Sequence, residues 1–173
     1  MKRFVLLLLS VVAMSAYGQE IKKNEVDEFT GAQVIETSWE KVVWQMKPDM
    51  CMYARFRIVN GREILDIKCM RNNPLVVTPD DPIMFLDENK ASHKFYPTDT
   101  FMGGKGQAAV KVMEQSSWGI YIHYKGNFSF LLNSAPLKLR WYTSEGYIDG
   151  EIKKKHQKNL PELYRLAKEA ASN

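Results

Sequence analysis

The three histidines of this sequence, the side chains best suited to acid–base chemistry near neutral pH, lie far apart. They are His93, His123 and His156. None has a second histidine, a cysteine or a carboxylate at the short spacing typical of a zinc site. Asp80 and Asp81 stand between two prolines, without the further spaced acids of a calcium loop. The sequence therefore predicts no metal site and no cofactor.

Two motifs that could support catalysis or phosphate binding are incomplete. The Gly-x-Ser-x-Gly elbow that exposes a nucleophilic serine does not occur, and residues 116–119 read as a turn entering a strand. Residues 103–106 are rich in glycine but lack the four-residue gap and the following Ser or Thr of a phosphate-binding loop. We therefore expect a turn and a flexible loop here, and we name no catalytic residue.

Paired carboxylates are the one catalytic arrangement that the sequence leaves open. Glycoside hydrolysis needs two acids about 5 to 9.5 Å apart, and sequence spacing does not identify such a pair. Asp149 and Glu151 share a strand face, but pairing with Arg140 gives Glu151 a structural role. A secreted hydrolase of glycan or peptide, with unassigned carboxylates, is therefore the alternative function.

Aromatic side chains give the main indication of a binding surface. The chain has four tryptophans and eight tyrosines, which can stack on sugars or pack against partner proteins. Residues 118–124 alternate as a core-facing strand that begins with a buried Trp118, which leaves Tyr121 and His123 on the reverse face. Tyr142 and Tyr147 fall on or near the outer face of the last hairpin. We predict that these four residues mark a binding surface.

The elements that must position these residues include a β-hairpin at Asn60-Gly61. This dipeptide accepts the positive φ angles of a type I′ turn, and alternating apolar and polar residues flank it. Pairing Val59 with Arg62 separates an apolar face from a polar face, whereas a slip of one residue would bury the charged pairs. The expected apolar pairs are Phe56–Leu65, Ala54–Ile67 and Met52–Cys69, and the polar pairs are Arg55–Asp66 and Tyr53–Lys68.

The same register bears on the only two cysteines, Cys51 and Cys69. An oxidising compartment favours a disulfide between them. The register opposes it, because Cys69 is expected opposite Met52 while Cys51 faces the other way, so a direct bridge needs a bulge in the first strand. The sequence leaves this disulfide open.

A second hairpin is expected around the turn Ser144-Glu145-Gly146. Residues 137–143 alternate before the turn, and residues 147–152 form the return strand. With Ser144 opposite Tyr147, the expected pairs are Leu139–Ile152, Trp141–Gly150 and Arg140–Glu151.

The remaining pattern completes an α+β fold. Further strands are indicated at 33–39, 82–86, 94–96, 108–113 and 118–124. Asn127 is expected to cap a short helix, and Asn159 a C-terminal helix. The apolar stripe of that last helix comprises Leu160, Leu163, Tyr164, Ala167 and Ala170. We therefore predict a mainly antiparallel sheet or sandwich of about eight strands with the C-terminal helix packed on it.

The first eighteen residues predict a removable signal peptide. Lys2 and Arg3 precede an apolar run from Phe4 to Met14, and residues 16–18 form a small-x-small cleavage site. The run is shorter than the roughly 20 residues that a membrane-spanning helix needs. We expect cleavage to leave residues 19–173 as one β-rich domain, exported to the periplasm, the cell surface or the medium without a transmembrane anchor.

The charge of the chain argues against a nucleic-acid partner. The formal net charge of +4 falls to +2 when Lys2 and Arg3 are removed. Nucleic-acid binding favours a strongly basic face instead. The densest basic run, at residues 153–158, is expected to be a solvated surface beside the last helix.

Three short turn-and-strand segments occur together: Asp27–Gly31, Thr37–Trp39 and Tyr142–Ile148. They resemble segments of a group of small exported bacterial proteins of no known activity, and the resemblance spans most of the mature chain. It implies a secreted β-rich domain with a C-terminal helix, typical of bacteria with an outer membrane. It implies no catalytic residue, ligand or cofactor.

These observations predict a non-enzymatic binding or structural module that acts outside the cytoplasm on a protein or glycan partner. The hydrolase is the alternative. Converging polar side chains with a strongly perturbed carboxyl or histidine in a concave site would favour the enzyme. A flat aromatic patch would favour the binding module.

Overall fold

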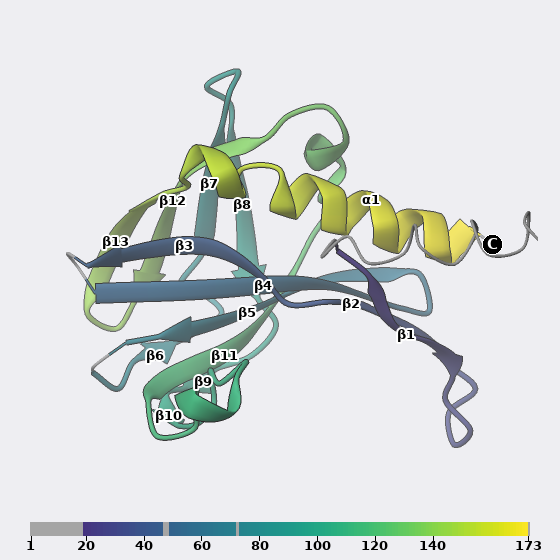
Figure 1. Cartoon of the computed structure of the whole chain (residues 1–173), viewed down its shortest axis with the longest axis horizontal. Coiled ribbons are helices and arrows are strands. Elements are labelled where there is room, and N and C mark those ends of the chain that lie inside the picture. Colours follow the sequence, from purple (N-terminus) through teal and green to yellow (C-terminus); the bar gives the residue numbers. More distant parts are fainter. Residues whose placement is uncertain (1–18, 47–48, 72, 173) are drawn as a thin grey trace, which may run out of the picture.

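The computed structural model describes residues 19–46, 49–71 and 73–172, so the predicted signal peptide lies outside the described residues. One large antiparallel sheet carries a C-terminal helix (Figure 1). This arrangement confirms the predicted α+β class. No helix in the described ranges combines the length and the apolar character that crossing a bilayer requires.

The strands are β1 (Ile21–Val26), β2 (Gln33–Thr37), β3 (Glu40–Met46), β4 (Asp49–Val59), β5 (Arg62–Met70), β6 (Val76–Val77), β7 (Ile83–Asp87), β8 (Ser92–Pro97), β9 (Phe101–Met102), β10 (Gly104–Lys105), β11 (Trp118–Lys125), β12 (Pro136–Thr143) and β13 (Gly146–Glu151). The helices are the 3-10 turns η1 (Val112–Glu114), η2 (Ser129–Leu132) and η3 (Lys154–His156), and α1 (Asn159–Ser172). The main sheet has the order β1-β2-β4-β5-β11-β8-β7-β12-β13, with β3 also on β4 and β10 also on β11. β6 and β9 form a separate pair.

The hairpin of β4 and β5 has the predicted register. Val59 pairs with Arg62, and every expected apolar and polar pair along the two strands is formed. Asn60 and Gly61 have φ angles of 48° and 76°, which are the left-handed values that a type I′ turn requires. The turn and the hydrophobic pattern therefore act together to set this register.

The two cysteines occupy the positions that the register predicts. Cys69 pairs with Met52, and Cys51 pairs with Met70. Neighbouring residues of a strand point to opposite faces, so the two cysteine side chains start from opposite faces of the hairpin. A disulfide between them stays a prediction.

The hairpin of β12 and β13 forms, but its predicted register is wrong by two residues. Thr143 pairs with Gly146 across a two-residue turn. The resulting pairs are Leu139–Gly150, Trp141–Ile148 and Arg140–Asp149. This pairing places Gly146, whose φ is 95°, at the end of the turn as the first residue of β13. A shift of two residues keeps every side chain on its face, so the alternation could not exclude the wrong register.

The strand expected at residues 108–113 does not form. The segment turns into η1, where the Glu114 carboxylate accepts hydrogen bonds from the backbone N–H groups of Val110 and Lys111. These local bonds replace a strand ladder. Val112 and Met113 are 80% and 89% exposed. The strand prediction failed here because it assumed that these apolar residues are buried.

The C-terminal helix packs through its predicted stripe. Leu160, Leu163, Tyr164 and Ala167 are buried in α1, and Ala170 packs against the core. α1 lies across β1 to β4 (Figure 1). The Asn159 side chain does not act as the expected cap. Its amide donates to the Lys41 carbonyl at 2.8 Å and thereby ties the start of α1 to β3.

The short helix after Asn127 is confirmed as the 3-10 turn η2. The Asn127 side chain accepts a hydrogen bond from the Ser129 N–H at 2.9 Å. Phe128 and Leu131 are buried, whereas Leu132 is exposed. The turn therefore covers one side of the core through Phe128 and Leu131.

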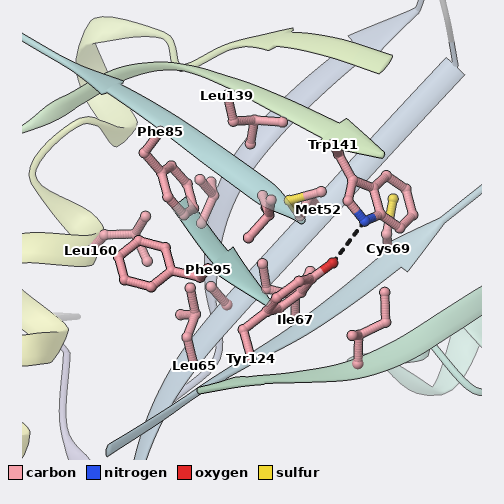
Figure 2. Close-up of a cluster of buried hydrophobic side chains, with 14 of the residues drawn as sticks. Met52, Leu65, Ile67, Cys69, Phe85, Phe95, Tyr124, Leu139, Trp141 and Leu160 are labelled. Carbon is pink, nitrogen blue, oxygen red and sulfur yellow. Dashed lines mark hydrogen bonds between the residues drawn. The ribbon is translucent and has the colours of Figure 1, made fainter. Parts of the chain in front are cut away.

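The sheet is strongly curved around its core. Gln45 of β3 donates to the Asp149 carbonyl of β13 at 3.0 Å, although β3 and β13 are far apart in the strand order. Side chains from distant strands meet inside this curve, among them Met52, Phe85 and Trp141 (Figure 2). The outer face of the sheet is thereby left for polar and aromatic side chains.

Candidate functional site

Tyr121 and His123, two of the four predicted binding residues, lie side by side on the outer face of β11. Their rings meet edge to face with centroids 4.6 Å apart. Ile120 and Ile122 point into the core, as predicted. Trp118 does not follow the predicted pattern: it is 37% exposed at the first position of β11, where the strand has just emerged from a surface turn.

Both side chains bind Asp66, a carboxylate with no exposed side-chain surface. The Tyr121 hydroxyl donates to Oδ2 at 2.9 Å, and His123 Nδ1 lies 2.7 Å from Oδ1. Two arginines from β4 complete the set: Arg55 Nε donates to Oδ2 at 2.9 Å and Arg57 donates to Oδ1 at 3.1 Å. We call these five residues the Asp66 cluster. Four donors satisfy the buried carboxylate, as a buried charge requires.

The cluster keeps Asp66 ionised. Burial alone would raise the pKa of its carboxyl, but His123, Arg57 and Arg55 outweigh burial and hold that pKa below the usual range. Burial and the neighbouring Asp66 charge raise the pKa of Tyr121 to about 12. At neutral pH Tyr121 therefore keeps its proton and donates it to the carboxylate.

The same geometry assigns the proton on the His123 ring. An ionised carboxylate only accepts hydrogen bonds, so Nδ1 must carry the proton that points at Asp66. In neutral His123, Nε2 is then an acceptor. In the part of the chain that the structure describes, no residue forms a hydrogen bond with Nε2, and the side chain is 29% exposed. His123 is thus held by one nitrogen and can present the other to a ligand.

Further residues on the outer face hold the cluster in place. Glu36 of β2 accepts a hydrogen bond from Arg55 at 2.6 Å. The Trp39 ring lies against the Arg55 guanidinium, 4.8 Å from the ring centroid, and against the Lys68 ammonium at 4.9 Å. Lys68 in turn donates to the Ala109 carbonyl at 2.7 Å, which fixes the loop after β10 over the sheet. Burial, followed by the nearby Arg55 charge, lowers the pKa of Lys68.

A shallow groove runs beside the cluster. Its volume is about 530 Å³. It is lined by Thr100, Phe101, Met102, Gln107, Tyr121 and His123. The Phe101 ring stands almost perpendicular to the His123 ring, at 83° with centroids 5.3 Å apart. We call this depression the β11 groove. It brings together aromatic surfaces, one amide, one imidazole and two hydroxyls, of which that of Tyr121 is bound to Asp66.

Tyr142 and Tyr147 form a second aromatic surface on β12 and β13. They are cross-strand neighbours with ring centroids 6.0 Å apart. The Arg140 guanidinium lies 4.2 Å from the Tyr147 ring centroid and binds both carboxylate oxygens of Asp149, at 2.7 and 2.9 Å. Among the described residues, no ring contact joins this pair to Tyr121 or His123. The four predicted residues therefore fall into two separate surfaces.

A hollow of about 570 Å³ lies on the outer face of β7, β12 and β13. Met84, Leu86, Lys138 and Arg140 line part of it. The register correction changes how its charges are paired, because Arg140 binds Asp149 and Glu151 lies opposite Lys138. Asp149 and Glu151 thus each have a basic neighbour across the hairpin.

A third polar group has the residue types of a catalytic triad but the wrong connectivity. Asp87 Oδ2 accepts from the Ser134 hydroxyl and contacts His93 Nε2, both at 3.0 Å. A triad needs the histidine between the serine and the acid, so that it can take the serine proton. Here the acid is in the centre. The hydrogen bond from His93 is the largest influence that lowers the pKa of Asp87, and the group holds the turn between β7 and β8.

Side chains that could bind a metal ion do not cluster in the described ranges. There, no group of three or more His, Cys, Asp or Glu side chains has a geometry that could hold a metal ion. His156, the third histidine, lies in η3. The candidate site is therefore the Asp66 cluster with its groove.

Fold and site together define an α+β protein with one large curved antiparallel sheet, a small two-stranded sheet, a C-terminal helix and a polar cluster on the outer face of the large sheet. No protein-family model, no curated protein and no solved structure matches the chain. The resemblance of its turn-and-strand segments to exported bacterial proteins stays a prediction.

Sequence reasoning identified Tyr121 and His123 as outward-facing, and it paired Arg55 with Asp66. It did not find Glu36, Trp39 or the other four groove residues, Thr100, Phe101, Met102 and Gln107. The Arg55–Asp66 pair could have indicated the rest of the cluster. A charged pair in the middle of a long hairpin needs further partners if a neighbouring strand covers it.

Proposed function

We propose that this protein is a non-enzymatic binding module that acts outside the cytoplasm and holds a protein or glycan partner in the β11 groove. The supporting observation is that the Asp66 cluster orients Tyr121 and His123 at the wall of this groove. Side chains locked by a second layer of hydrogen bonds are what a preorganised binding site needs.

The composition of the cluster supports a role beyond stability. A buried ion pair is often no more stabilising than apolar residues of the same volume, because removing charges from water is costly. The outer face of a sheet could instead be covered by apolar side chains. The cluster places three charged residues and one imidazole there, with Asp66 fully buried. Precise orientation of the groove residues explains this arrangement.

The position of Asp66 favours binding over hydrolysis by a carboxylate pair. Its side chain has no exposed surface, so it does not reach a ligand in the groove. The described lining of the groove contains no other carboxylate. A glycosidase of the usual type would need two such groups facing the substrate.

One observation favours the hydrolase as a second candidate. A carboxylate that binds Nδ1 and leaves Nε2 available is the arrangement that orients a histidine as a general base. Asp66 and His123 have this arrangement. In that case His123 would activate a water molecule against a glycan or peptide bond in the groove.

Export rests on the predicted signal peptide at residues 1–18. Expression of the full chain in an outer-membrane bacterium, followed by fractionation and intact-mass measurement, tests it. A mature form that begins at Gln19 and lies outside the cytoplasm supports the proposal. A full-length chain in the cytoplasm contradicts it.

The binding proposal is tested with His123→Ala and, as a matched control, Tyr147→Ala on the second aromatic surface. The purified protein is applied to arrayed glycans and to an immobilised peptide library. Binding that is lost in the His123 variant and kept in the Tyr147 variant supports the proposed function. Release of reducing ends or amines from the same ligands, abolished by His123→Ala, favours the hydrolase instead.

A further inference from the structure

We infer that the β11 groove binds a neutral carbohydrate, with a sugar ring packed on its aromatic walls and hydroxyls bound by Gln107, Thr100 and His123. This inference rests on the proposed function and names the ligand class. It follows from four properties of the groove: charge, aromatic geometry, hydrogen-bonding groups and the pairing of β11.

The lining carries no fixed charge. Its six residues include no Lys, Arg, Asp or Glu. The charged groups behind it are paired with one another, since Arg55 and Arg57 both bind Asp66. A charged ligand would lose hydration in the groove without meeting an opposite charge. The groove therefore favours a neutral ligand.

The aromatic walls suit a flat ligand with an apolar face. Phe101 and His123 stand at 83° to each other and form a corner, and the Tyr121 ring meets the His123 ring at 76°. Met102, which is 68% exposed, extends the apolar surface at the rim. The C–H face of a pyranose can pack on such rings while its hydroxyls stay at the edge.

The polar groups suit hydroxyls. A sugar hydroxyl both donates and accepts hydrogen bonds, as do the Gln107 amide and the Thr100 hydroxyl. His123 Nε2 offers one further site, fixed in direction by Asp66. These groups sit around an apolar corner, so a ligand needs hydroxyls around an apolar face to satisfy them.

The pairing of β11 argues against a peptide bound by strand addition. That mode needs a sheet edge with unpaired backbone groups. β11 pairs with β5 along its length, and on its other side with β10 at its start and β8 at its end. Between these ends the His123 carbonyl accepts from the Thr98 N–H at 2.8 Å, and the described strand pairs leave only residues 120–122 of β11 for an added strand. An extended peptide would find too short an edge, so side chains must provide most of the recognition.

Saturation-transfer NMR tests this inference on the purified protein with four probes. Cellotetraose, maltotetraose and tetra-N-acetylchitotetraose are neutral, and tetragalacturonate is negatively charged. We expect at least one neutral tetrasaccharide to bind and tetragalacturonate not to bind. Gln107→Ala and His123→Ala should each weaken binding about five- to tenfold, which corresponds to one lost hydrogen bond. Phe29→Ala, which removes an aromatic ring that is 99% exposed in the turn after β1, should leave it unchanged.

Gln107 keeps the test decisive, because it is exposed and lies outside the Asp66 cluster. Its loss should not disturb the fold, and the melting temperature of each variant checks this. Binding of tetragalacturonate alone, binding that survives both variants, or no binding of any probe would overturn the carbohydrate inference. If peptides bind instead and His123→Ala abolishes that binding, the proposed function stands without the carbohydrate. If neither ligand class responds to His123→Ala, both fail.

Discussion

The Trp141 indole of β12 donates a 2.8 Å hydrogen bond to the Tyr124 hydroxyl of β11, and both side chains are fully buried (Figure 2). Two strands, β8 and β7, separate β11 from β12 in the sheet order. The bond therefore spans the core rather than a strand pair. It satisfies two polar groups that water does not reach.

We expect Tyr124→Phe to destabilise the protein by about 1 to 3 kcal/mol, because it leaves the Trp141 N–H buried without its partner. Urea unfolding, followed by tryptophan fluorescence, measures the change. The double variant Tyr124→Phe/Trp141→Phe is the control. Its loss should be smaller than the sum of the two single losses. Strictly additive losses would contradict a coupling between these two groups.

The Asp66 cluster predicts a pH-dependent stability. The pKa of Asp66 in the folded chain lies below that of an unfolded chain. Its contribution is therefore fully present above about pH 4 and is lost as pH falls through the folded pKa. Asp66→Asn should reduce the free energy of unfolding by about 3 kcal/mol at neutral pH, because Arg55 and Arg57 lose a buried partner.

The difference between wild type and Asp66→Asn should shrink when unfolding is measured at about pH 3. Asp80→Asn is the matched control, since Asp80 is an exposed acid in a turn. It should change stability by less than about 0.5 kcal/mol at either pH. A difference for Asp66 that stays constant or grows towards acid pH would contradict the role assigned to the cluster.

The attachment of α1 gives a third prediction. The Tyr164 hydroxyl donates to Glu63 of β5 at 3.0 Å, and Lys168 one turn later contacts the same carboxylate at 3.0 Å. Tyr164 is buried, whereas the Lys168 side chain is 45% exposed. Tyr164→Phe should therefore destabilise the protein by about 1.5 to 3 kcal/mol, and Lys168→Ala by no more than about 1 kcal/mol. Thermal unfolding of both variants checks this order, and the reverse order would contradict it.

The two hairpins show when the residues of a turn are enough to predict the register of its strands. Asn60 and Gly61 both adopt positive φ angles, and few residue pairs do so readily, so this turn can be placed only one way. The turn at residues 144–146 has one glycine and allows two placements. These differ by two residues and keep the same faces. The wrong placement then assigned Arg140 to Glu151 instead of Asp149.

Only part of the candidate site could be predicted from the sequence, because some of its contacts are local and others depend on strand order. Arg55 and Asp66 belong to one hairpin, so their pairing is a local property. Their contact with Tyr121 and His123 depends on β11 pairing with β5, a contact between segments about fifty residues apart along the chain. Strand order in a sheet follows from the packing of the whole core, and no local pattern encodes it.

Gly119 lies very close to the loop after β10, and this contact gives the last prediction. A Cβ atom on Gly119 would lie 2.3 Å from the Ala108 Cβ and 2.8 Å from the Cys69 carbonyl oxygen. Gly119→Ala should therefore destabilise the protein by about 1 to 3 kcal/mol through overpacking. It should also displace the loop that carries Gln107, a residue of the β11 groove.

The double variant Ala108→Gly/Gly119→Ala removes the nearer of the two clashes and should recover part of the lost stability. It should not recover all of it, because the contact with the Cys69 oxygen remains. Chemical denaturation measures the stabilities, and proteolysis between residues 103 and 117 reports the position of the loop. If Gly119→Ala is as stable and as protected as wild type, the loop does not rest on Gly119. The groove wall would then owe its position to the Lys68–Ala109 bond and the η1 turn alone.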